Sequence, residues 1–227
     1  MKNKNLFKIL SFTFSLIVIM NVSACASSKG IAEPHKTEGP LFAHNNPGSD
    51  NVKSGKPVDI NKYRDLLIDI NRYTTNGGYY QKKHEKHLLS MAGEIVEGQN
   101  LEISKKSVGF YFDKISANKD ILFLGFDVNI EKENTSDYGK FSVNIIKENV
   151  NGIIDLMYKY NFILNESGIA GIVIGFKWKA GMNFEHVNIW MNKEDIRLFY
   201  NKKITINELF LRSITTNSSG KVILLPI

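Results

Sequence analysis

Hydrophobic residues recur at helical spacing in three stretches of the chain. They predict a helix over residues 59–73, which Asn76-Gly77-Gly78 stops, and a second, charged helix over residues 79–96 that ends at Gly98. The strongest helical stripe lies over residues 141–160 and predicts the main core helix. Its apolar positions include Ile145, Ile146, Ile153, Ile154, Met157 and Tyr158.

Other stretches alternate between apolar and polar residues with a period of two. This period is typical of a strand with one face buried and one face in water. Four such strands are expected, over residues 108–112, 122–130, 169–179 and 184–191.

Two of these strands carry residues that need an explanation. Asp127 is interpreted as part of the solvent-facing side of its strand, with Asp113 as a carboxylate that could pair with it across neighbouring strands. Glycine inside a strand often marks a close approach of backbone. We attribute Gly171 and Gly175 to a helix that lies unusually near the sheet.

The C-terminal part of the chain has clear helix signals. Asn192 is expected to cap a short helix, and Thr205-x-x-Glu208 is a capping box for a further helix through Ile214. Residues 215–220 then predict a turn, and residues 222–225 a last strand. Because these strands and helices do not alternate as β-α-β units, we expect an α+β fold, a mainly antiparallel sheet packed against helices.

The N-terminus has a different pattern, because its hydrophobic residues surround the whole helix that they would form. Lys2, Lys4 and Lys8 precede or begin an apolar stretch that runs to Met20 and is followed by Val22-Ser23-Ala24-Cys25. A basic start, an apolar segment and small residues in that order are typical of a signal peptide. A membrane span, the alternative, needs about 20 apolar residues, and this stretch is shorter.

Val22-Ser23-Ala24-Cys25 resembles the lipobox of bacterial lipoprotein precursors, and the resemblance covers residues 1–25 only. It implies a diacylglyceryl group on the Cys25 thiol, cleavage before Cys25, and acylation of the new amino terminus by a fatty acid such as palmitate. Ordinary cleavage after Ala24 or Ala26 is the alternative. The resemblance further implies an exported, membrane-anchored protein, on the outer membrane if the host is Gram-negative.

Composition divides the chain into a signal peptide at 1–24, a lipidated Cys25 with a flexible tether at 25–57, and one globular domain at 58–227. The tether is rich in Ser, Gly, Pro, Asn and Lys. As a flexible coil it would span roughly 30 Å. Removing the three lysines of the signal lowers the formal charge of +6 to +3. Such a small excess gives no support for nucleic acid binding.

His84 and His87 form the only local cluster that suggests a metal site, since residues three apart share a helix face. A zinc site needs a third ligand, and Glu94 or His186 would have to supply it. The adjacent lysines oppose a cation, so a solvated helix face is the favoured interpretation. No metal and no other cofactor is expected.

Two further groups are candidates for binding or catalysis. His186, near Trp190, could serve as a general base in a pocket, although a hydrogen-bonded residue of a sheet is the commoner case. Lys177, Trp178 and Lys179 could form a basic, aromatic surface for a glycan, an acidic partner or lipid headgroups. The alternation instead favours Trp178 as a core residue, with the lysines on the other face.

Three function classes follow. The first is a lipid-anchored binding or assembly protein of the cell envelope, attached to the membrane through Cys25 and holding a protein partner. The second is an immunity or exclusion lipoprotein that neutralises a toxin or phage. The third is an envelope hydrolase that uses His84 and His87, or His186. The first is preferred because neither a Gly-x-Ser-x-Gly elbow nor a second cysteine occurs in the sequence.

Overall fold

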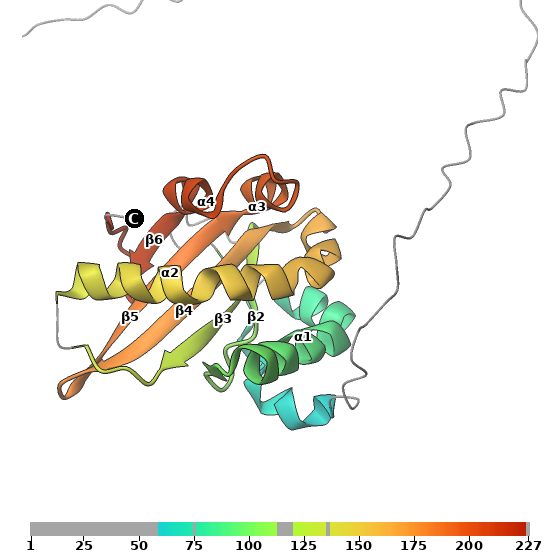
Figure 1. The fold of residues 1–227 in the computed structure, drawn as a ribbon. Helices are drawn as coiled ribbons and strands as arrows, with labels where there is room; N and C mark the ends of the chain where they lie inside the picture. Colours follow the sequence, from blue (N-terminus) through green and yellow to red (C-terminus); the bar gives the residue numbers. More distant parts are fainter. Residues whose placement is uncertain (1–58, 75, 113–119, 135–136, 226–227) are drawn as a thin grey trace, which may run out of the picture. The chain divides into compact units, whose positions relative to one another are not determined.

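The described residues form an α+β fold in which one mixed, mostly antiparallel sheet packs against helices (Figure 1). The structure is a computed structural model and describes residues 59–74, 76–112, 120–134 and 137–225. All of them belong to one compact unit, Lys53–Ile227. The fold class expected from the hydrophobic pattern is therefore confirmed. The expected signal peptide, Cys25, the tether and Asp113 lie outside the described residues.

The sheet has the order β1-β3-β4-β5-β6, with β2 also paired to β3. Strands β3 and β4 are parallel, and the other neighbours are antiparallel. Parallel neighbours need a long connection, which helix α2 and the 3-10 helix η3 provide. The strands are β1 (Glu102–Ile103), β2 (Gly109–Phe112), β3 (Leu122–Ile130), β4 (Ile169–Ala180), β5 (Asn183–Asn192) and β6 (Ile214–Asn217).

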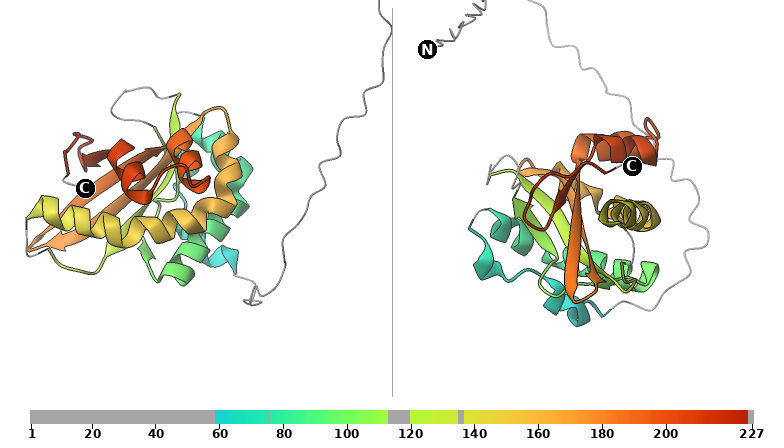
Figure 2. Two further views of the ribbon diagram at one scale, coloured as in Figure 1. Left: turned by 45° about the horizontal axis from the view of Figure 1, so that its top comes forward. Right: turned by 90° about the vertical axis from the view of Figure 1, so that its left-hand side faces the viewer.

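The helices lie mainly on one face of the sheet, with α2 crossing it (Figures 1 and 2). Among the described residues, none of the helices has both the length and the hydrophobicity that a membrane span requires. The α-helices are α1 (Gly77–Gln99), α2 (Tyr138–Met157), α3 (Lys193–Tyr200) and α4 (Ile206–Arg212). The 3-10 helices are η1 (Ile60–Leu66), η2 (Ile70–Arg72) and η3 (Tyr158–Asn165).

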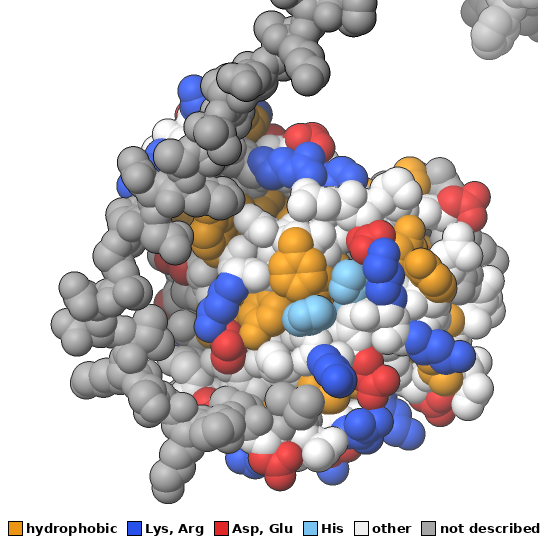
Figure 3. Space-filling model, turned by 90° about the vertical axis from the view of Figure 1, so that its right-hand side faces the viewer, with side chains coloured by type: hydrophobic (Ala, Val, Ile, Leu, Met, Phe, Trp, Pro, Cys, Tyr) orange, Lys and Arg blue, Asp and Glu red, His pale blue; other side chains and the backbone are white. Residues whose placement is uncertain are grey.

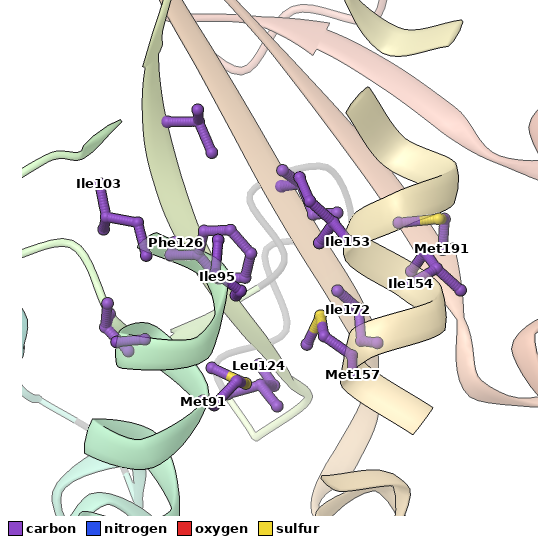
Figure 4. Close-up of a cluster of buried hydrophobic side chains, with 14 of the residues drawn as sticks. Met91, Ile95, Ile103, Leu124, Phe126, Ile153, Ile154, Met157, Ile172 and Met191 are labelled. Carbon is purple, nitrogen blue, oxygen red and sulfur yellow. The ribbon is translucent and has the colours of Figure 1, made fainter. Parts of the chain in front are cut away.

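The main core lies between this face of the sheet and the helices. In Figure 4, side chains from α1 and α2 point toward side chains from β3, β4 and β5, and together they exclude water. Burial of such side chains is the main force that holds the elements together. The labelled core residues on these elements are Met91, Ile95, Leu124, Phe126, Ile153, Ile154, Met157, Ile172 and Met191, all at most 2% exposed.

The helix expected over residues 59–73 is wrong, because this segment forms the short helices η1 and η2 instead. The carboxylates of Asp59 and Asp69 each accept a hydrogen bond from the backbone two residues later, which starts a new turn. Between them Leu67 is extended and pairs with Val108 of the sheet. Tertiary pairing therefore interrupts the helical pattern.

The C-terminal expectations are correct only in part. Helix α4 has the capping box between Thr205 and Glu208, but it ends at Arg212. The expected turn is wrong over its first residues, since Ile214–Asn217 form β6 beside β5. The expected last strand is reduced to a single bridge between Thr216 and Val222. Asn192 precedes α3 as expected, although its side chain makes no capping hydrogen bond.

The close approach at the glycines of β4 involves the sheet itself, so the expected nearby helix is wrong. A Cβ on Gly171 would lie 2.0 Å from the backbone oxygen of Met191 in β5. A Cβ on Gly175 would lie 2.1 Å from Asp127 Oδ1 and 2.6 Å from His186 Nε2. Gly171 therefore keeps two strands together, and Gly175 leaves room for polar side chains of the neighbouring strands.

Candidate functional site

A cleft of about 520 Å³ lies on the sheet face opposite α2. The right-hand view of Figure 2 looks along α2 and shows this helix on one side of the strands. Strands β3, β4 and β5 form the floor. The segment around Arg72 and Tyr73 and the loop 104–107 form one wall, and Thr216 with Ser218 and Gly220 forms the other.

Strand register places polar side chains in one row across the floor. Asp127 of β3 pairs with Gly175 of β4, Gly175 pairs with Asn188 of β5, and Asn188 pairs with Thr216 of β6. The Asn188 side-chain amide donates a hydrogen bond to Thr216 Oγ1 at 3.2 Å. Because Gly175 has no side chain, the residues on both sides of it can lean toward one another over the backbone.

His186 lies two residues before Asn188 in β5, on the same face of the strand, and pairs with Lys177 in the register. Its Nε2 lies 3.6 Å from Asp127 Oδ1, which is an ion-pair distance for a protonated ring but too long for a hydrogen bond. Among the described residues, this buried nitrogen has no hydrogen-bond partner. The His186 and Asp127 side chains as a whole remain 21% and 31% exposed, so a ligand in the cleft can contact them. The pair can thus recognise a polar ligand.

An apolar end adjoins the polar row. Phe123, Val173 and Trp190 form a second buried cluster, and the Phe123 and Trp190 rings meet edge to face at 5.2 Å. Trp190 Nε1 donates a hydrogen bond to Thr216 Oγ1 at 3.0 Å. The cleft therefore combines an aromatic end with a polar floor, which is the usual composition of a ligand pocket.

Two tyrosines fix the walls of the cleft. Tyr111 donates its hydroxyl to the backbone oxygen of Ser107, and burial, with the charge of Asp127 adding to it, holds the tyrosine pKa well above its ordinary value. Tyr73 donates to Gln81 Oε1 at 2.6 Å, and burial raises its pKa to about 12. Both hydroxyls are therefore neutral near pH 7 and act as donors rather than bases.

Cationic side chains outnumber acidic ones around the cleft. Arg72, Lys106 and Lys177 line it, as does Lys105, whose ammonium pairs with Asp65 at 3.3 Å. Among the described residues that line the cleft, Asp127 is the one with a carboxylate. Positive charge at the rim favours a ligand with an acidic group.

The metal candidates His84 and His87 lie elsewhere, on α1. Figure 3 shows histidine side chains beside hydrophobic ones on this side of the molecule. His84 is buried and its Nε2 lies 3.0 Å from Glu166 Oε1, while the ring of His87 packs edge to face on Phe162. His87 therefore contacts η3, and His84 contacts Glu166, the residue that follows η3.

Neither of the two residues considered as a third ligand, Glu94 and His186, is placed beside these histidines. Glu94 pairs with Lys159 at 2.5 Å, and His186 lies in the cleft with Asp127. Across the described residues, no group of three or more histidine, cysteine or acidic side chains is placed to hold a metal ion. The zinc geometry considered from the sequence is therefore not assembled here.

The basic, aromatic candidate surface is divided between the two faces of the sheet. Trp178 is 1% exposed and packs on Tyr138 and Phe141 of α2. Lys177 and Lys179 are exposed. Trp178 therefore belongs to the core, as alternation along the strand favours. The two lysines lie on the opposite face of the sheet, away from the Trp178 ring.

Some of the cleft residues can be recognised as candidates in the sequence, and others cannot. His186 and Lys177 were candidates, whereas Asp127 was interpreted as a solvent-facing residue. Arg72, Tyr111, Asn188 and Thr216 gave no local signal. The glycine at 175 was the one available sign, because an unexplained glycine in a strand marks a crowded position.

Comparison with known proteins gives no relative. No protein-family model matches the chain, and no curated protein or solved structure matches it significantly.

Proposed function

We propose that this chain is a lipid-anchored binding protein of the bacterial cell envelope, attached to the membrane through Cys25 and binding an acidic partner in the open-face cleft. The observation that carries the proposal is the convergence of Asp127 and His186 over Gly175 in the cleft on the sheet face opposite α2. The lipobox resemblance supports the anchor.

The chemistry of the cleft supports an acidic partner. A carboxylate or phosphate group would pair with Arg72, Lys106 or Lys177 at the rim. Hydroxyl or amide groups of the same partner would bond with Asp127 and His186 on the floor. Its apolar part would contact Trp190 and its neighbours.

A hydrolase is the second candidate, and one observation favours it. His186 beside Asp127 has the arrangement of a histidine base held by a carboxylate, although 3.6 Å is long for that role. The hydroxyl of Thr216, in the same row, already accepts hydrogen bonds from Asn188 and Trp190. Binding is therefore the better supported function. An immunity or exclusion role would use the same cleft, with a toxin or phage protein as the partner.

Photo-cross-linking in intact cells tests the binding proposal. A photoreactive residue at Lys106, on the rim, is expected to capture a partner, whereas one at Tyr79, exposed on α1, is not. The double variant Asp127→Asn with His186→Gln should lower capture from Lys106 on the order of tenfold, since the carboxylate charge and the imidazole ring are both lost.

His87→Gln is the matched control, because it makes the same histidine change outside the cleft. Capture from Tyr79 as strong as from Lys106, or capture that survives the double change in the cleft, would disprove the proposed site. Turnover of the captured partner that stops with His186→Gln would instead establish the hydrolase.

A further inference from the structure

The hairpin formed by β4 and β5 extends beyond its neighbours in the sheet (Figure 1). The last residue of β4 paired to β3 is Trp178, and the first residue of β5 paired to β6 is Val187. From Lys179 to Phe184 the two strands pair with each other, beyond the ends of β3 and β6. This end of the hairpin is called the tip below.

The tip carries two large apolar side chains in water. Met182 is fully exposed and Phe184 is 68% exposed. Gly181 turns the chain with φ +59°, and no atom lies within 4 Å of the position a Cβ would take there. The tip is therefore convex and open, unlike the cleft. Exposed apolar residues gathered at one point mark a surface that contacts an apolar medium or partner.

Basic side chains accompany these residues on the same face. Lys177 Nζ lies 4.8 Å from the centre of the Phe184 ring, and Lys179 pairs opposite Phe184 in the register. Within the hairpin the acidic residue is Glu185, and it is directed to the other face, where its carboxylate accepts from Trp178 Nε1 at 2.7 Å and from Asn134. Glu131 and Glu133 lie on the neighbouring segment, whose Asn134 donates its backbone N–H to the oxygen of Lys179. The Phe184 ring therefore has two lysines beside it, Lys177 and Lys179.

We propose that the tip is a membrane-docking element that inserts Met182 and Phe184 into a bilayer surface containing anionic lipids. A convex point with apolar ends fits a planar, deformable interface, where the apolar side chains leave water. Lysines beside it match the negative charge of anionic headgroups, and each contributes to binding near the surface. The tip is a different surface from the cleft, and it would be a second membrane contact in addition to the proposed lipid on Cys25. It would orient the domain at the membrane.

Sedimentation with vesicles tests this element. The protein used is residues 53–227, a compact unit that holds the whole described core and lacks the apolar N-terminus. It is expected to bind vesicles of phosphatidylcholine mixed with phosphatidylglycerol, and to bind phosphatidylcholine alone more weakly. Met182→Ser with Phe184→Ser should lower binding to the mixed vesicles at least about tenfold. Lys179→Glu should lower it on the order of fivefold.

Leu224→Ser is the matched control, because Leu224 is 97% exposed at the C-terminal end and lies outside the tip. Its binding should equal that of the unchanged protein. Absence of binding to the mixed vesicles, or equal binding by the double tip variant, would overturn the proposal. Cross-linking from Lys106 in the cleft reports separately on the proposed function.

Discussion

Gly171 and Gly175 lie four residues apart in β4, yet a methyl group would meet different atoms at each. At Gly171 it would collide with the backbone oxygen of Met191, which the sheet holds in place. At Gly175 it would meet the ends of the Asp127 and His186 side chains, which can rotate away. Gly171 is therefore needed for the pairing of β4 with β5, whereas Gly175 is needed for the arrangement of side chains in the cleft.

This difference predicts two outcomes for the same substitution. Gly171→Ala should lower the free energy of unfolding by about 3 kcal/mol, because strand backbones must separate, which is at the upper end for overpacking. Gly175→Ala should lower it by about 1 kcal/mol or less while reducing partner capture in the cleft. Urea denaturation and cross-linking from Lys106 measure the two effects. Equal losses of stability would contradict the assignment.

At the scale of elements, Glu166 joins the end of η3 to α1. Its Oε1 lies 2.7 Å from Lys83 Nζ and 3.0 Å from His84 Nε2. The hydrogen bond from Lys83, with that of His84 adding to it, lowers the pKa of Glu166 from its ordinary 4.5. His84, considered from the sequence as a metal ligand, therefore has a structural partner.

The lowered pKa fixes the pH at which this link acts. Since the folded pKa lies below the unfolded one, the stabilisation is present above pH 4.5 and is lost as pH falls through the folded value. Glu166→Gln should therefore lower the unfolding midpoint at pH 7, and the difference should shrink toward about pH 3. Thermal unfolding at both pH values measures it.

Glu148→Gln is the control for this prediction, because it removes an exposed pair with Lys132, and such pairs contribute little. A difference between Glu166→Gln and the unchanged protein that persists undiminished at low pH would show that packing, rather than charge, causes it.

Elements with a long, regular pattern were predictable. Helices α1 and α2 and strands β3, β4 and β5 form where the hydrophobic period places them, within a few residues. The segments that differ are short ones whose backbone pairs with distant residues. Leu67 pairs with Val108, and β6 pairs with β5. Pairing across such distances has no local sequence signal, since only the folded chain brings the partners together.

At the scale of the whole molecule, the proposed anchor on Cys25 gives a direct prediction. Cys25→Ser should abolish lipid labelling, because the thiol that would carry the lipid is gone, and it should release the domain from membranes washed with high salt. The salt wash removes electrostatic binding by the tip, whose attraction is screened. Labelling with a fatty acid and fractionation of cells measure the two outcomes. A variant that stays in the washed membranes would favour the uncleaved membrane span.

The sequence by itself determined the fold class and the long elements, because each depends on a local pattern of hydrophobicity, and a pattern of the same kind predicts the export signal. It also marked His186, Lys177 and the glycines of β4 as unusual. Only the tertiary structure decided what these residues do. Strand register brings Asp127, Gly175 and Asn188 into one row, although they are far apart along the chain. The packing of α2 on the opposite face leaves this row at the floor of a cleft, and the hairpin of β4 and β5 extends Met182 and Phe184 beyond the neighbouring strands. Those placements depend on contacts between distant residues, which a local pattern does not encode.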